Sequence, residues 1–143
     1  MSLLFSFFGR IGRGGFWLGV LLSFIISGVI IGVAAALVPW GEVILKGPDG
    51  QPLTGPDGTM QLDWSSTKMM PAYIGYGLAM LLSLWNGFAV AVKRAHDRGN
   101  SGWWTLLMFI PLVGAVWWLV ALGILEGQDG ANQYGPDPRA AKA

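Results

Sequence analysis

Three long stretches without a charged residue constrain this chain more than any other feature. They cover residues 16–38, 71–92 and 103–125. A helix rises about 1.5 Å per residue, so each stretch would reach roughly 33 Å, enough to cross a hydrocarbon layer of about 30 Å. The pattern predicts an all-α membrane protein with three transmembrane helices.

The rest of the composition supports the same fold class. Charged residues make up 12% of the chain, against about 25% in a soluble domain. The net charge of +1 and the lack of any zinc-finger spacing argue against a nucleic-acid partner. Cysteine is absent and there is one histidine, so we expect no disulfide, no metal site and no cofactor. We predict one membrane domain over residues 1–143.

Residues 1–15 are apolar and aromatic apart from two arginines, Arg10 and Arg13. Helical spacing would place both arginines on one face. We interpret the segment as an interfacial one, whose arginines meet lipid phosphates; a disordered apolar tail is the alternative. The stretch 16–38 is longer than the core of a typical signal peptide, which favours a membrane anchor.

The long polar loop, residues 39–70, contains the sequence Gly-Pro-Asp-Gly twice, at 47–50 and 55–58. Each copy predicts a tight turn, because Pro fixes φ, Asp accepts local hydrogen bonds and Gly adopts positive φ. A small β-hairpin fits the apolar residues on either side. The aspartates are too sparse for a calcium loop.

Small residues recur every fourth position along the second stretch, which predicts a face where another helix backbone can approach closely. Asn86 is the one strongly polar side chain in the middle of this stretch. It is expected either to bond across a helix interface or to mark a transport path. The predicted packing residues are Gly75, Ala79, Ser83, Asn86, Gly87 and Ala91.

The hinge, residues 93–102, and the start of the third stretch hold the densest polar cluster of the chain. Gly99 is expected to end one helix, and Ser101 or Asn100 to cap the next. Asp97 is the lone acid there and is expected to pair with the surrounding arginines. The predicted ion-pair and lipid-headgroup cluster consists of Arg10, Arg13, Arg94, His96, Asp97, Arg98, Ser101, Trp103 and Trp104.

The neighbours His96 and Asp97 raise a catalytic alternative. Adjacent side chains point in different directions and cannot easily form a relay. The chain also lacks a nucleophile motif and a second histidine. We therefore expect no catalytic residues and no enzyme, although a site shared between copies in an oligomer stays open.

Lysine and arginine are denser in the N-terminal segment and the hinge than in the loop 39–70 and the tail 126–143. With three spans, this bias predicts a cytoplasmic N-terminus and hinge, and a periplasmic loop and C-terminus. Pro111 and Gly114 predict a kink in the third span.

Four motifs taken in order resemble one known family. They are Phe8-Gly9-Arg10-Ile11-Gly12-Arg13-Gly14-Gly15-Phe16-Trp17, Arg94-Ala95-His96-Asp97-Arg98-Gly99-Asn100-Ser101-Gly102-Trp103-Trp104, Ile110-Pro111-Leu112-Val113-Gly114 and Asn132-Gln133-Tyr134-Gly135-Pro136-Asp137-Pro138. The set resembles the domain of unknown function 805 family of small bacterial inner-membrane proteins. Ala95 stands where that family usually has Leu, and Gly14-Gly15 where a charged pair is common. The resemblance implies a multi-pass inner-membrane location and supplies no mechanism.

Three functions follow from these observations. The leading hypothesis is a non-enzymatic accessory or assembly subunit that associates laterally with other integral membrane proteins or with itself, among membrane lipids. The second is a component of a small oligomeric transporter or channel, with Asn86 and the hinge charges facing a pore. The third is a membrane-bound enzyme that uses His96 and Asp97.

Overall fold

The structure is a computed structural model that describes residues 3–140. It is mostly helical, and no regular strand occurs in this part of the chain. Its contacts form two compact units. Unit 1 comprises Met1–Ile25 and Leu82–Ala143, and unit 2 comprises Ile26–Leu81.

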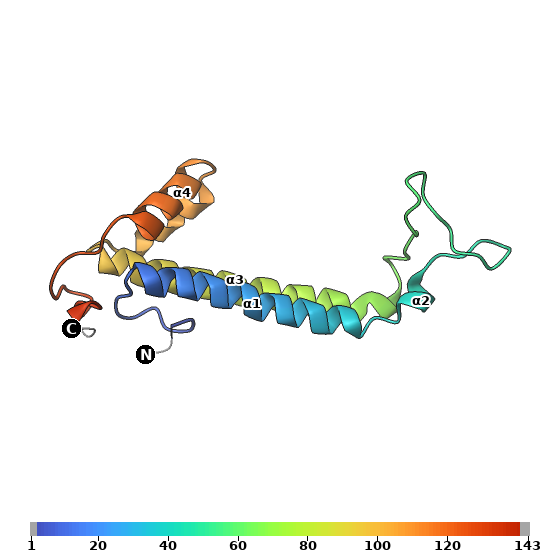
Figure 1. Cartoon of the computed structure of the whole chain (residues 1–143), viewed down its shortest axis with the longest axis horizontal. Helices are drawn as coiled ribbons and strands as arrows, with labels where there is room; N and C mark the ends of the chain where they lie inside the picture. Colours follow the sequence, from blue (N-terminus) through green and yellow to red (C-terminus); the bar gives the residue numbers. More distant parts are fainter. Residues whose placement is uncertain (1–2, 141–143) are drawn as a thin grey trace. The chain divides into compact units, whose positions relative to one another are not determined.

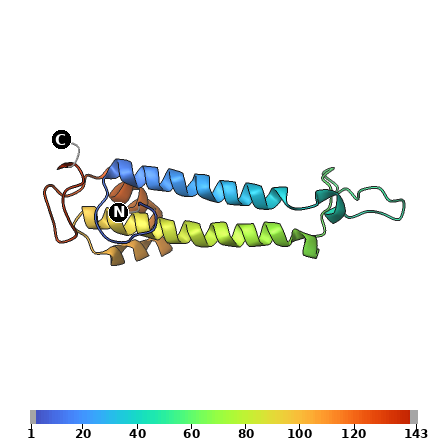
Figure 2. The same cartoon turned by 90° about the horizontal axis from the view of Figure 1, so that it is seen from below.

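Two helices, α1 (Arg13–Ala36) and α3 (Met70–Asp97), are long and apolar enough to cross a membrane. The candidate spans are Arg13–Ala36 and Thr67–Asp97, and only 11% and 33% of their most apolar windows are buried. The core helix of a soluble protein would be mostly covered, so these faces suit lipid. Figures 1 and 2 show α1 and α3 running antiparallel within each unit.

In unit 1, the two helices approach closely at Gly19. A Cβ atom there would lie 2.7 Å from the Cγ2 atom of Val90. In unit 2, a Cβ atom on Gly75 would collide with the side chain of Ala34. Close backbone approach at small residues is how helices associate in lipid.

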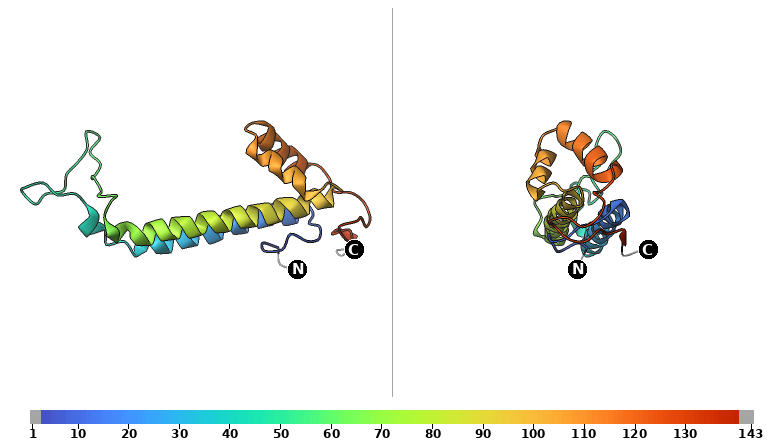
Figure 3. Two further views of the ribbon diagram at one scale, coloured as in Figure 1. Left: turned by 180° about the vertical axis from the view of Figure 1, so that it is seen from behind. Right: turned by 90° about the vertical axis from the view of Figure 1, so that its left-hand side faces the viewer.

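The predicted continuous third span over 103–125 is wrong. Those residues form a helical hairpin instead: η2, a 3₁₀ helix (Gly102–Phe109), then α4 (Val113–Val116), which continues as η3, a π-helix (Trp117–Ile124). Figures 1 and 3 show the hairpin beside the C-terminal part of α3. Eight residues of 3₁₀ helix rise roughly 16 Å, about half of a hydrocarbon layer.

The reversal lies at Pro111 and Leu112, where a kink was expected. Leu112 has φ 61° and ψ −56°, and the Val113 amide donates to the Pro111 carbonyl at 2.7 Å, which makes a γ-turn of positive φ. A Cβ atom on Gly114 would collide with the backbone of the first arm at Leu107 and Met108. Glycine therefore lets the two arms touch.

The loop of unit 2 contains both predicted turns but not the β-hairpin. Gly50 and Gly58 have φ 77° and 78°, which confirms the turns. The antiparallel pairing consists of isolated bridges, among them Lys46 with Pro52. Two tight turns eight residues apart and a proline without an amide hydrogen leave too few residues for a ladder. The loop also holds α2 (Trp40–Val43) and η1, a 3₁₀ helix (Thr67–Met69), around a small core of Val38, Val43 and Met69.

The N-terminal segment is not helical before Arg13. It folds back on α3 instead: Leu4 is buried, the Phe7 ring meets Trp85 edge to face at 5.0 Å, and the Lys93 ammonium donates to the Leu3 carbonyl. The expectation that Arg10 and Arg13 share a helix face is therefore wrong. Residues 1 and 2, part of the predicted interfacial segment, lie outside the described residues.

Candidate functional site

Four consecutive backbone carbonyls end the returning arm of the hairpin, and each accepts a side-chain hydrogen bond from α1 or α3. Arg94 donates to Leu122 at 2.8 Å and also to Leu125. Trp17 donates to Gly123 at 3.2 Å, and Arg13 donates to Ile124 at 3.3 Å. We call Arg13, Trp17 and Arg94 the carbonyl clamp.

The carbonyl clamp supplies hydrogen-bond donors that the end of a helix lacks. The last four carbonyls of a helix have no partner inside the helix. Near hydrocarbon, water cannot be counted on to satisfy them, and each unsatisfied group costs several kcal/mol. Two guanidinium groups also complement the negative end of the helix dipole. The clamp therefore satisfies the backbone carbonyls at the end of the returning arm of the hairpin.

Arg10 holds the C-terminal tail in the same way. Its guanidinium donates to the carbonyls of Gln128 at 2.6 Å, Gly130 at 2.5 Å and Gly135 at 3.3 Å. The tail and the N-terminal segment therefore lie on the same side of the helices. These contacts run against the predicted placement of the N-terminus and the C-terminus on opposite membrane faces. Figure 3 shows the hairpin turning back beside the C-terminal part of α3.

Asp97 joins the two sets of contacts. One carboxylate oxygen pairs with Arg94, and the other lies 3.2 Å from Nε of Arg10. The side chains of Arg94, Arg10 and Asp97 are 0%, 1% and 3% exposed. A Cβ atom on Gly127 would collide with this carboxylate, so only glycine lets the chain leave the hairpin here. We call Arg10, Arg94 and Asp97 the buried cluster.

His96 contacts the N-terminal segment and the tail, and it also lines an open pocket of about 380 Å³ together with Ser101 and Trp103. Its ring stacks on Tyr134, with centroids 3.9 Å apart and planes at 5°, and its Nδ1 atom lies 3.4 Å from the Gly9 carbonyl. The side chain of Asn132 donates to the His96 carbonyl at 2.9 Å. The histidine therefore helps to join three segments of unit 1.

The tail is closed by its own ion pairs, which Arg139 makes with two aspartates. Arg139 lies 2.5 Å from Asp129 and 3.1 Å from Asp137. Hydrogen bonds from the Arg139 side chain and amide, and from the Gly130 amide, hold the pKa of Asp137 well below its usual range. In turn, the hydrogen bonds to the carboxylates of Asp137 and Asp129 raise the pKa of Arg139. Asp137 and Arg139 are thus charged at neutral pH.

The remaining residues of the predicted cluster are placed around this centre. Arg13 pairs with Glu126 at 2.9 Å instead of Asp97, and both are about half exposed or more. Arg98 is half-buried and makes none of the ion pairs found within residues 3–140. Gly99, with φ 73°, follows α3, and Ser101 caps η2, as predicted. Trp103 and Trp104 are exposed, as interfacial aromatic residues are.

The predicted packing stripe on α3 divides into two parts. Gly75, Ala79 and Ala91 are buried. Ser83 and Gly87 line an apolar groove of about 300 Å³. The last predicted packing residue, Asn86, is 1% exposed, and its side-chain oxygen has no hydrogen-bond partner in residues 3–140.

Trp17 and Glu126 belong to this site, but the predicted cluster did not include them. Gln128 also contributes, through its backbone, because its amide donates to the Asp97 carbonyl at 2.8 Å. Trp17, Asn132 and Tyr134 were visible as motif residues, so their place in a motif was the available signal. Within the described residues, no group of three or more His, Cys, Asp or Glu residues could hold a metal ion.

The chain belongs to the class of small helical proteins that are compatible with membrane insertion. It has two long apolar helices, and the carbonyl clamp fastens a short hairpin that follows them in the chain. The family described as "Protein of unknown function (DUF805)" matches residues 4–136. The chain belongs to this family.

Three relatives are proteins of Escherichia coli K12. "Inner membrane protein YhaH" is 28% identical over 136 residues, covering 94% of this chain and 88% of the relative. "Inner membrane protein YhaI" is 47% identical over 53 residues, 36% of this chain and 42% of the relative. "Uncharacterized protein YiiR" is 29% identical over 163 residues, 97% of this chain and 90% of the relative. No solved structure matches the chain.

Proposed function

We propose that this chain is a non-catalytic protein of the bacterial inner membrane. It crosses the membrane twice, keeps both termini in the cytoplasm, and associates laterally with another integral membrane protein or with itself. The membrane assignment draws on the names of YhaH and YhaI and on the two candidate spans. The relatives' names give no activity, and the buried cluster gives its donors to protein carbonyls and carboxylates.

The proposed orientation follows from the distribution of basic residues in a two-span chain. The loop 39–69 holds Lys46 and Lys68. The N-terminal segment, the C-terminal end of α3 and the described tail hold six of the nine Lys and Arg residues: Arg10, Arg13, Lys93, Arg94, Arg98 and Arg139. Basic residues favour the cytoplasmic face. The excess of basic residues on the proposed cytoplasmic side is larger with two spans than with three, because the tail then lies on that side.

The observation that carries lateral association is an apolar hollow of about 550 Å³ on the hairpin, lined by Leu112, Val113, Val116, Trp117, Val120 and Ala121. Leu112, at the tip, is 82% exposed in a strained conformation. Strain of this kind persists where surrounding structure or function requires it. A hollow of apolar side chains in lipid suits close packing by another helix.

A site-specific photo-crosslinker tests this association in native membranes. Placed at Val116 in the hollow, it is expected to give a discrete protein adduct. The matched control is Val29 on α1, which is equally exposed at 60% against 61% but lies outside the hollow. Equal crosslinking at both positions, or none at Val116, would refute lateral association through the hairpin.

The absence of cysteine makes the topology directly testable. With Ser65→Cys in the loop and Ala131→Cys in the tail, an impermeant maleimide is expected to label position 65 in spheroplasts and position 131 only after lysis. Both residues are exposed. Labelling of position 131 from outside would overturn the two-span topology.

The alternative of a transporter gains no support, because Asn86 is buried rather than available to a pore.

A further inference from the structure

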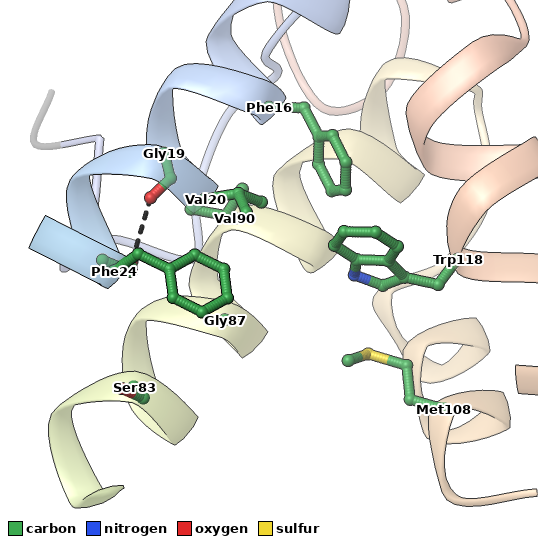
Figure 4. Close-up of a pocket in the computed structure, with 10 residues that line it drawn as sticks. Phe16, Gly19, Val20, Phe24, Ser83, Gly87, Val90, Met108 and Trp118 are labelled. Carbon is green, nitrogen blue, oxygen red and sulfur yellow. Dashed lines mark hydrogen bonds between the residues drawn. The ribbon is translucent and has the colours of Figure 1, made fainter. Parts of the chain in front are cut away.

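An apolar groove of about 300 Å³ lies in unit 1, between α1, α3 and the hairpin. Figure 4 shows Phe16 and Trp118 ring against ring on one side, with Met108 below them and Phe24 on the other side. Gly19 and Gly87 belong to the same lining, and a Cβ atom on Gly87 would meet nothing within 4 Å. The groove therefore lies over a part of the helix surface where glycine leaves space that a side chain would fill.

A second cavity of about 370 Å³ lies at the cytoplasmic end of the same helices in the proposed orientation. Four of its lining residues are arginines and two are acids: Arg10, Arg13, Arg94, Arg139, Asp97 and Glu126. Arg10 and Arg94 give their donors to Asp97 and to backbone carbonyls, and Arg139 pairs with Asp129 and Asp137, so Arg13 carries the cavity's most accessible positive charge, in contrast to the uncharged groove. Arg13 is the most available donor, since its side chain is 51% exposed.

The two cavities follow one another along both helices. On α1, Gly15 lines the charged cavity and the next residue, Phe16, lines the groove. On α3, Arg94 and Val90 do the same, one turn or about 6 Å apart. A charged cavity at the membrane surface thus passes into an apolar groove at hydrocarbon depth.

We propose that unit 1 binds one anionic phospholipid, with its phosphate in the charged cavity and an acyl chain in the apolar groove. The inference goes beyond lateral association and rests only on the proposed membrane location. Guanidinium groups bind phosphate oxygens well. A zwitterionic headgroup would add an ammonium to a lining in which arginines outnumber acids.

The size of the groove selects the occupant. Its volume lies at the lower end of small-molecule sites, about 300–1,000 Å³. An acyl chain segment fits this space, whereas a helix is about 10 Å across and needs more room for even one turn. A lipid tail is therefore the occupant that this chemistry and volume favour over a second protein helix.

Native mass spectrometry of the detergent-purified full chain tests the proposal. The probes are phosphatidylglycerol and phosphatidylcholine with identical acyl chains, and inorganic phosphate as the headgroup alone. One phosphatidylglycerol is expected to stay bound, on the order of tenfold more than phosphatidylcholine, with no retention of phosphate. Equal retention of the two lipids, or retention of phosphate alone, would overturn the proposal.

Matched variants separate the two halves of the site. Gly87→Leu fills the groove and is expected to reduce phosphatidylglycerol retention about tenfold, whereas Gly28→Leu, at a glycine with equally open surroundings outside the groove, leaves retention unchanged. Arg13→Gln is expected to lower retention of phosphatidylglycerol to that of phosphatidylcholine, and Lys68→Gln, an exposed cation of the loop, to have no effect. Equal effects within either pair would contradict the proposal.

A wild-type measurement guards against misfolded variants. Phosphatidylglycerol with a photoreactive group on its acyl chain is expected to label the peptides that contain Met108 and Trp118 in preference to the exposed Val29 of α1. Labelling spread evenly over the exposed apolar residues would show a lipid annulus without a site. Failure of this experiment leaves the hairpin crosslink at Val116 unaffected, so the two proposals fail separately.

Discussion

The two units contain ion pairs of the same chemistry in opposite surroundings. In unit 1, the partners Arg94 and Asp97 are 0% and 3% exposed. In unit 2, Lys68 and Glu42 are 48% and 61% exposed. Exposed pairs contribute about 0–1 kcal/mol, whereas removing one partner of a buried pair costs about 3–5 kcal/mol because the other charge is left uncompensated. Burial, rather than the pairing itself, makes the first cluster a determinant of the fold.

The largest expected effect is that of Asp97→Asn. This change leaves both Arg94 and Arg10 in the buried cluster without their carboxylate. We expect a loss of about 3–5 kcal/mol in the free energy of unfolding. Unfolding of the purified chain in mixed detergent micelles, followed by circular dichroism, measures it.

The matched control is Glu42→Gln, which breaks the exposed pair with Lys68. Its expected cost is below about 1 kcal/mol. If both variants lost the same stability, the contrast between the two units would be wrong, and the buried cluster would be no more important than a surface pair.

Helix packing, rather than charge, is expected to dominate unit 2. Gly75→Ala forces a Cβ atom against Ala34, and overpacking of this kind costs about 1–3 kcal/mol. Gly77→Ala, two residues away with open surroundings, is expected to be neutral or to stabilise by up to about 1 kcal/mol through helix propensity. The same unfolding measurement compares them. Equal effects would mean that α1 and α3 do not touch at Gly75.

The fold could be predicted where one physical rule acts alone. Length and hydropathy suffice for α1 and α3, and positive φ at glycine suffices for the turns at Gly50 and Gly58. The third apolar stretch has the same length and hydropathy as a span, yet it turns back. Its reversal depends on a contact between the arms at Gly114 and on carbonyls satisfied by residues about 30 to 110 positions away. Local pattern does not contain that information.

The same limit applies to the site. Asp97 could be singled out because it is the lone acid among arginines, and Arg10 and Arg94 do lie against it. Arg13 could not be assigned, since its actual partners, Glu126 and the Ile124 carbonyl, come close only after the hairpin returns. The predicted third span placed the tail far from Arg10 and Arg13, so the tail residues that complete the site were not considered.

The turns of the two units provide a smaller test of the comparison. Gly50 in unit 2 has φ 77°, so Gly50→Ala is expected to cost about 1 kcal/mol. Leu112 in unit 1 has φ 61° with a side chain present, so Leu112→Gly is expected to stabilise by about 1 kcal/mol. Unfolding free energies check both. A loss of stability in Leu112→Gly would mean that the exposed Leu112 side chain contributes more than the strain costs.

The smallest expected effect is that of acid on the ion pairs of the tail. The folded pKa of Asp137 lies below its ordinary value of 3.8 because Arg139 and the Gly130 amide donate to it. Because the folded pKa is depressed, the ionised Asp137 contributes its full stability to the docked tail above the ordinary pKa of 3.8. That stability is lost as the pH falls through the folded pKa. We expect the Gly130 amide resonance to titrate below about pH 4 and to stop titrating in Asp137→Asn. Glu42→Gln, which removes an exposed carboxylate of lowered pKa in the loop, should leave that titration unchanged. A Gly130 titration that persists in Asp137→Asn would show that another acid causes it, and would contradict the assignment to Asp137.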